Sequence, residues 1–157
     1  MALMVSLSYL LVACSPSEPA APRGATLGNL KNVYYTMAVF ENDTNKTIGA
    51  LLREVPTGTS LQEKWRTLVA ADAARDGLDP VNLQEHLCKD GFGRLFNIDT
   101  RTNLIAMSAS TNLTTSRFDI AVWSSGPNGT NELGEGDDIV LRPDDVDRIS
   151  GPREPGG

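Results

Sequence analysis

One segment limits the folds open to this chain more than any other, a glycine-rich acidic stretch between two apolar runs. The apolar run 118–123 leads into residues 124–138, which include four glycines and one proline, and the apolar run 139–141 follows. Glycine adopts backbone angles that other residues avoid, so this segment can fold back between two strands. Asp137 and Asp138 close it, and gathered carboxylates repel one another unless a positive charge lies among them. A hard cation with oxygen ligands would supply that charge.

The alternative is a long hairpin connection without an ion. Asn128 and Gly129 form a dipeptide typical of tight turns between antiparallel strands. In that case Asp137 and Asp138 are surface charges.

Length and composition indicate one soluble globular domain with a tail. The chain has 157 residues, of which 40% are hydrophobic and 22% are charged, and these values are ordinary for such a domain. Residues 131–149 contain seven Asp and Glu residues and two Arg residues, so five of the six net negative charges lie there. The absence of a basic patch in the sequence argues against nucleic acid as a partner. For residues 144–148 we expect plain solvation.

The first thirteen residues are apolar apart from Ser6, Ser8 and Tyr9. A helix of that length cannot span a bilayer, which needs about 20 residues, but it matches the apolar region of a signal peptide. Residues 11–14 resemble the lipobox of bacterial lipoproteins, in which the cysteine, here Cys14, receives the lipid. This resemblance implies a lipid anchor in the cell envelope, facing the periplasm, and the serine after Cys14 favours the outer membrane. No Lys or Arg precedes the run, which leaves an ordinary apolar terminus as the alternative.

These features divide the chain into four parts. Residues 1–13 form a lipoprotein signal peptide, residues 14–25 a proline-rich tether, residues 26–149 the folded domain and residues 150–157 a disordered tail. A lipidated Cys14 leaves Cys88 alone, and the alternative is a disulfide between them.

Helices are expected in the first half of the chain. An apolar stripe at helical spacing predicts a helix over residues 26–41, ended by the polar residues 42–45. Ser60 and Glu63 have the spacing of a capping box, which predicts a second helix that ends at Gly77. Asp79 followed by a proline predicts a third, short helix that ends near Cys88.

Short strands are expected in the second half. Apolar or alternating runs at residues 95–98, 104–108, 118–123 and 139–141 are separated by turn residues, which predicts an antiparallel meander. Trp123 should be buried at the end of its strand, with its indole N–H paired. Helices followed by strands give an α+β fold, in which the helices pack on a small antiparallel sheet with a long glycine-rich acidic loop.

Two motifs in a fixed order resemble the C-terminal domain of the major pseudopilin of type II secretion systems. Residues 90–96 (DGFGRLF) are similar to the family's Asp-Pro-Trp-Gly-Asn-Pro-Tyr element. Residues 124–129 (SSGPNG) and 134–139 (GEGDDI) are similar to its Ser-x-Gly-Pro-Asp-Gly and Gly-Thr-x-Asp-Asp-Ile elements. The match covers roughly residues 27–141 in layout, and only these motifs are specific.

In that family the glycine-rich loop binds calcium. The resemblance implies Asp137 and Asp138 as side-chain ligands, with Asn128 where the family usually has Asp. Ser124 or Ser125, and the carbonyl of Leu133, would complete the shell. Asn128 carries one negative charge less and the loop is longer than in the family, so we expect weak calcium binding.

The N-terminus departs from the family. Pseudopilins begin with a prepilin cleavage site, a Phe-Thr-Leu-x-Glu sequence and a long apolar helix, and residues 1–25 match none of these. The expected function is therefore a non-catalytic assembly or interaction component of a type II secretion or pilus-like system, carried on a lipid anchor. The alternative is a lipid-anchored binding module with an unrelated envelope role.

An enzyme is not expected. The chain has no Gly-x-Ser-x-Gly, no His-Glu-x-x-His and no phosphate-binding glycine loop before a helix. His86 is the only histidine, and a partly exposed helical position is expected for it. Residues 90–96 are expected to have a structural role, with Phe92 and Phe96 packed under the sheet.

Overall fold

The computed structural model describes residues 22–115 and 117–150. Within these residues it contains seven helices and one two-stranded antiparallel sheet, so the predicted α+β class is confirmed. The predicted signal peptide, Cys14 and most of the tether lie outside the described residues, as does the tail from residue 151 onward. Among the described helices, none is both long and apolar enough to cross a membrane.

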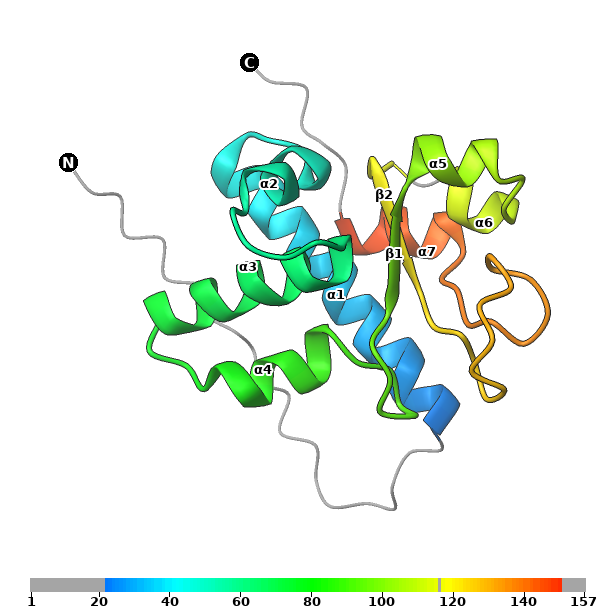
Figure 1. Ribbon diagram of the computed structural model, residues 1–157, viewed down its shortest axis with the longest axis horizontal. Helices are drawn as coiled ribbons and strands as arrows, with labels where there is room; N and C mark the ends of the chain where they lie inside the picture. Colours follow the sequence, from blue (N-terminus) through cyan, green and yellow to red (C-terminus); the bar gives the residue numbers. More distant parts are fainter. Residues whose placement is uncertain (1–21, 116, 151–157) are drawn as a thin grey trace.

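Helix α1 spans Pro22–Thr44 and crosses the centre of the molecule (Figure 1). It begins earlier and ends later than predicted, but its apolar stripe is the predicted one. Leu30, Val33 and Met37 are fully buried, because residues spaced three and four apart lie on one face of a helix.

Three further helices follow α1. Helix α2 (Ile48–Glu54) was not predicted, whereas α3 (Leu61–Arg75) and α4 (Pro80–Leu87) confirm the second and third predicted helices. Ser60 and Glu63 form the predicted capping box of α3, and the side chain of Asp79 caps α4.

The sheet pairs β1 (Asn97–Thr100) with β2 (Ile120–Trp123). The strands are antiparallel, with Asn97 opposite Trp123 and Ile98 opposite Val122. Every residue of β2 is buried. The predicted strand 118–123 is confirmed over its last four residues, and the predicted strand 95–98 is displaced by two residues toward the C-terminus.

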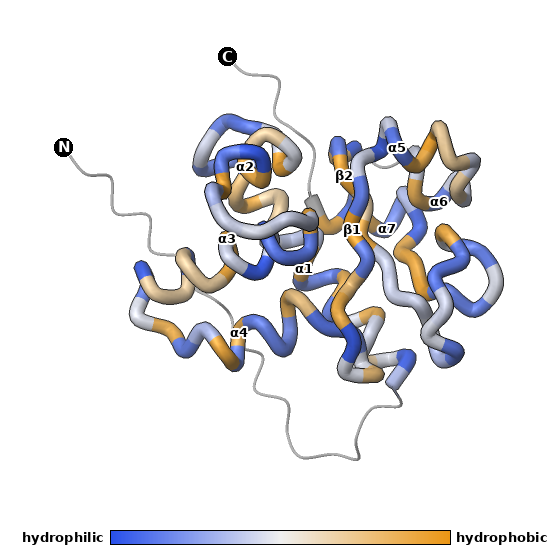
Figure 2. Tube along the Cα trace, in the orientation of Figure 1, coloured by the Kyte–Doolittle hydropathy of each residue, from blue (hydrophilic) through white to orange (hydrophobic). Residues whose placement is uncertain are grey.

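Strand β2 is buried because both of its faces are covered. Ile120 and Val122 belong to the main core with α1 and α3, whereas Ala121 and Trp123 face a second cluster. Leu104 and Leu113 of that cluster come from α5 (Arg101–Ala106) and α6 (Thr111–Thr114). In Figure 2 the segment after β2 is mostly hydrophilic.

The four-stranded meander is wrong in two places. Residues 104–108 were predicted as a strand, but Leu104 lies in α5, whose first turn is capped by the side chain of Thr100. Residues 139–141 form a single bridge, between Ser124 and Ile139, and no further ladder. Leu104 is the only fully buried apolar side chain of the run 104–107, so one helical turn buries it as well as a strand would.

The expected solvation of residues 144–148 holds for Asp144, Asp147 and Arg148, which are exposed, but these residues are not an irregular tail. They belong to helix α7 (Pro143–Ser150), which packs against α1. Val146 is buried in the main core, and Asp144 and Asp145 lie in the first turn of the helix. Acidic side chains there interact favourably with the helix dipole, so the acidic run forms a helix around one apolar anchor.

Candidate cation site

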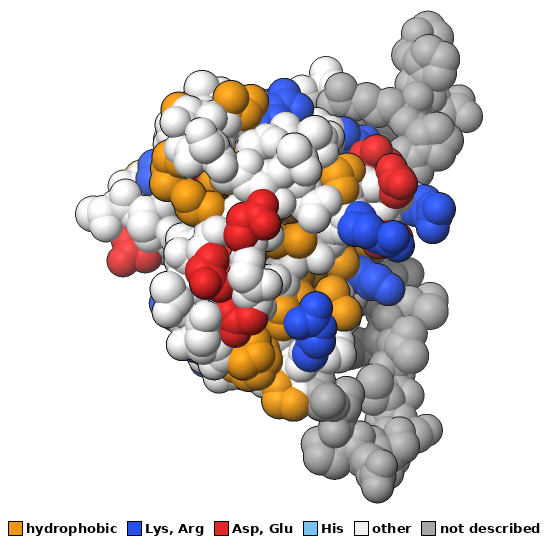
Figure 3. Space-filling model, turned by 90° about the vertical axis from the view of Figure 1, so that its right-hand side faces the viewer, with side chains coloured by type: hydrophobic (Ala, Val, Ile, Leu, Met, Phe, Trp, Pro, Cys, Tyr) orange, Lys and Arg blue, Asp and Glu red, His pale blue; other side chains and the backbone are white. Residues whose placement is uncertain are grey.

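The acidic segment returns from the end of β2 to Ile139 without regular secondary structure. Three of its side chains, Glu132, Asp137 and Asp138, place carboxylate oxygens within 4.8 Å of one another. Figure 3 shows acidic side chains gathered near the middle of the face that carries this segment. We refer to these three residues as the acidic cluster.

Backbone N–H groups hold one oxygen of each carboxylate. Asp138 Oδ2 accepts hydrogen bonds from the backbone N–H groups of Glu132 and Gly134, both at 2.9 Å. Asp137 Oδ2 accepts from the N–H of Asn128 at 2.9 Å, and Glu132 Oε2 accepts from the N–H of Asp137 at 3.0 Å. The segment therefore wraps around its own carboxylates and offsets part of their mutual repulsion.

The other oxygens of the two aspartates have no partner. Asp137 Oδ1 and Asp138 Oδ1 are buried and make no hydrogen bond, and Asp138 as a residue is only 8% exposed. Leaving a neutral buried polar group unpaired costs roughly 1–3 kcal/mol, and leaving a charged group unpaired costs more. A cation among the three carboxylates would remove that cost. Oxygen-only donors suit a hard cation such as calcium, so the residues present fit the ion that the family resemblance implies.

The backbone of the segment explains why glycine recurs in it. Leu133, Gly134 and Gly136 all have positive φ angles, of 55°, 83° and 57°. A Cβ atom at Gly136 would collide with the carboxylate of Glu132. These left-handed residues turn the chain so tightly that Glu132 lies beside Asp137, five residues later.

The other residues that the resemblance implied as ligands have partners of their own. Ser124 Oγ donates to Asp90 at 2.7 Å, and Ser125 Oγ accepts from the side-chain amide of Asn97. The carbonyl of Leu133 accepts from the N–H of Ser110 at 3.0 Å. Asn128 Oδ1 accepts from the N–H of Thr130, and its amide nitrogen lies 3.5 Å from Glu132.

Glu132 is the cluster residue that sequence reasoning missed. The available signal was the alternation of Glu132, Gly134 and Gly136 before the paired aspartates, since glycines at that spacing permit a reversal. The predicted burial of Trp123 is confirmed, because it is 2% exposed and its Nε1 donates to Asn131 at 2.9 Å. This contact attaches the acidic segment to the second cluster.

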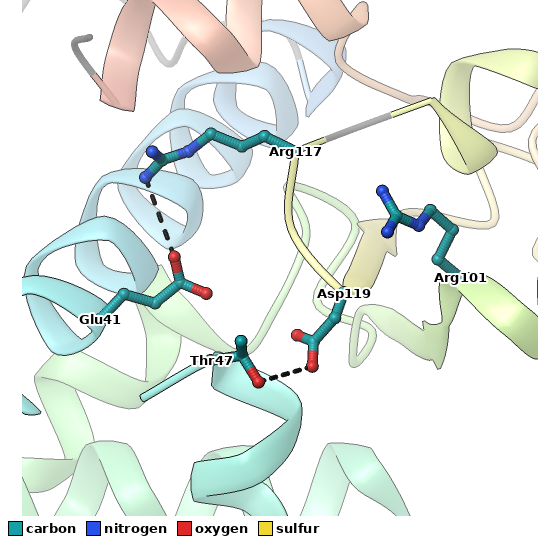
Figure 4. A pocket seen from close by; sticks show the side chains of 5 residues that line it. All are labelled: Glu41, Thr47, Arg101, Arg117 and Asp119. Carbon is teal, nitrogen blue, oxygen red and sulfur yellow. Dashed lines mark hydrogen bonds and ion pairs between the residues drawn. The ribbon is translucent and has the colours of Figure 1, made fainter. Parts of the chain in front are cut away.

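A second polar site is a pocket of about 200 Å³ lined by Glu41, Thr47, Arg101, Arg117 and Asp119 (Figure 4). Its two carboxylates accept hydrogen bonds from residues at the start of α2. Asp119 accepts from Thr47 Oγ1 at 2.7 Å and from the N–H of Gly49 at 2.9 Å, and Glu41 accepts from the N–H of Ile48 at 3.2 Å. These bonds fasten the start of α2 to α1, through Glu41, and to the segment before β2, through Asp119.

The remaining candidates are structural. His86 is exposed on α4, as predicted, and Phe96 is buried while Phe92 packs on the main core. Cys88 is a buried free thiol, and burial raises its pKa to about 12. The alternative disulfide to Cys14 lies outside the described residues.

Comparison with known proteins found no family model, curated protein or solved structure that matches this chain. Any function must therefore be argued from its own residues.

Proposed function

We propose that this chain is a non-catalytic, calcium-stabilised domain of the bacterial cell envelope, similar to the globular domain of the major pseudopilin of type II secretion systems. It would be held at the membrane through Cys14 and would bind protein components of a secretion or pilus-like assembly. The observation that carries the proposal is the acidic cluster with two buried oxygens that lack partners.

A second observation supports the resemblance. Its two motifs are far apart in sequence, but they touch in the fold. Ser124 donates to Asp90, and the guanidinium of Arg94 donates to the carbonyl of Gly126 at 2.7 Å.

The second candidate is a lipid-anchored binding module with another envelope role. Genes for a secretion ATPase and a prepilin peptidase beside its gene would favour the first candidate, and an isolated gene the second.

Calcium binding is tested by thermal melting and by terbium luminescence. We expect a Kd of about 10⁻⁴ to 10⁻³ M, as in extracellular calcium modules. Calcium at about 1 mM would then stabilise the fold by about 0.4–1.4 kcal/mol and raise the Tm by a few degrees. Magnesium should do less, because it requires near-octahedral geometry and loses water reluctantly. Terbium bound in the segment should be sensitised by Trp123.

Four variants make the test specific. Asp138→Asn and Glu132→Gln should abolish or weaken the calcium response, whereas Glu135→Gln, an equal charge change in the same segment, should leave it intact. Asn128→Asp should lower the Tm without calcium, by repulsion from Glu132, and should increase the calcium response. If calcium changes the Tm of neither the parent nor the Asn128→Asp protein, the segment is a hairpin connection and its carboxylates are surface charges.

A further inference from the structure

The turn formed by residues 90–94 lies against the first arm of the acidic segment, residues 124–129, and contributes no atom to the acidic cluster. We infer that Arg94, fixed by Asp90, is a positioning residue that sets the cation affinity of this segment. The inference rests on the proposed function, because it presumes that the acidic cluster holds calcium.

The turn is closed by its own hydrogen bonds. Asp90 is 4% exposed, and its Oδ1 accepts from the N–H groups of Phe92 and Arg94, both at 2.9 Å. The backbone N–H of Asp90 donates to the carbonyl of Arg94 at 2.8 Å. Gly91 donates to Thr26 Oγ1 at 2.8 Å, which attaches the turn to the first turn of α1. The turn is therefore held by its own hydrogen bonds and by its hydrogen bond to α1.

Two side chains of this turn, Asp90 and Arg94, contact the first arm. Asp90 Oδ2 accepts from Ser124 Oγ at 2.7 Å, and the same hydroxyl accepts from the N–H of Gly126 at 3.1 Å. Arg94 Nη2 donates to the carbonyls of Gly126 at 2.7 Å and Pro127 at 3.3 Å. A guanidinium presents several donors in a fixed plane, so it can hold two successive carbonyls together.

The first arm in turn positions the acidic cluster. The N–H of Asn128 holds Asp137 Oδ2, and a Cβ atom at Gly126 would collide with the backbone carbonyl of Asp137. A Cβ atom at Gly129, where φ is +74°, would collide with the Arg94 guanidinium. Arg94, the first arm and Asp137 thus form one continuous set of contacts. A displacement of the arm would move a carboxylate of the cluster.

Because Arg94 is positively charged, the direction in which calcium affinity changes when Arg94 is removed tests the inference. A guanidinium repels a bound cation, so its removal should tighten calcium binding if charge alone matters. If Arg94 positions the arm, its removal should weaken binding. Residues that orient metal ligands without touching the metal typically contribute 10–100-fold to affinity.

The experiment is isothermal titration with calcium, together with hydrogen exchange at the amides of residues 126–129, on the parent and three variants. Arg94→Ala should raise the Kd about tenfold or more and speed exchange of these amides in the calcium-free protein. Arg94→Lys keeps the charge but loses the planar set of N–H donors of the guanidinium, so its Kd should lie between those of the parent and Arg94→Ala. Arg53→Ala removes an exposed arginine of α2, far from the segment in Figure 1, and should match the parent.

A Kd of Arg94→Ala that is equal to or lower than that of the parent would overturn the inference and leave the calcium site standing. A parent protein that does not bind calcium would overturn the proposed function, and the inference with it. A lower Tm of Arg94→Ala with an unchanged Kd would show that the turn has only a structural role.

Discussion

The hydroxyl of Tyr34 forms hydrogen bonds with the backbone of β2 on the edge that does not pair with β1. Its removal should destabilise the fold strongly. It accepts from the N–H of Val122 at 3.0 Å and donates to the carbonyl of the same residue at 3.3 Å. Both residues are at most 3% exposed. Tyr34→Phe therefore leaves two buried backbone groups without partners, each at a cost of about 1–3 kcal/mol. We expect a loss of about 2–5 kcal/mol in the free energy of unfolding at pH 7.

The pH dependence gives an independent test of the same contact. Burial raises the pKa of the Tyr34 hydroxyl to about 12, although its hydrogen bond with the Val122 backbone lowers it. In the unfolded chain a tyrosine loses its proton near pH 10. The contribution of the protonated hydroxyl is thus fully present below about pH 10 and is lost as the pH rises through about 12. Two pKa units correspond to about 3 kcal/mol.

Urea denaturation of the parent and of Tyr34→Phe at several pH values measures both effects. The difference between the two proteins should fall by about 2 kcal/mol from pH 10 to pH 12, because the variant cannot ionise at this position. Tyr35→Phe is the matched control, since Tyr35 is the next residue of α1 and is 56% exposed. A difference below about 0.5 kcal/mol at pH 7, the size of an ordinary surface substitution, or one independent of pH, would refute the reasoning.

Two further predictions concern the ends of α2 and α4. Cys88 should react slowly with a thiol reagent in the native protein at pH 8 and quickly in urea, because burial raises its pKa to about 12 and blocks access; rapid native reaction would contradict this. Asp119→Ala should lower the free energy of unfolding by about 1–2 kcal/mol, because Thr47 Oγ1 and the N–H of Gly49 lose their acceptor. Asp43→Ala, an exposed position of α1, is the control in urea denaturation, and equal losses in both variants would disprove the anchoring of α2.

The sequence predicted those helices whose ends carry their own signals. Ser60 with Glu63, and Asp79 with its proline, are local patterns that fix a helix start whatever lies around it. Helix α2 has a weaker signal, and its start is held by Glu41 and Asp119, one before it and one far along the chain. Such an anchor is visible only once the chain is folded.

The predicted strands failed where an apolar run was short. Four or five apolar residues fit a strand or one turn of helix equally well, and the cap at Thr100 decided for helix α5. At the candidate site, Asp137 and Asp138 followed from the paired carboxylates. For Glu132 the spacing of Gly134 and Gly136 was the only signal. Whether Glu132 or Glu135 lies beside Asp137 depends on the left-handed angles at Leu133 and Gly136, which only the folded chain shows.

The fixed position of β2 explains why a bound cation would order only the acidic segment that follows this strand. Its edges are held by β1 and by the hydroxyl of Tyr34, and its faces are covered by α1 on one side and by α5 and α6 on the other. Ser124, the next residue, is fully buried and bound to Asp90. The chain therefore enters the acidic segment from a fixed point and leaves it at Ile139, which pairs with the same Ser124. Because both ends are fixed by the core, a bound cation would have only the residues between them to order.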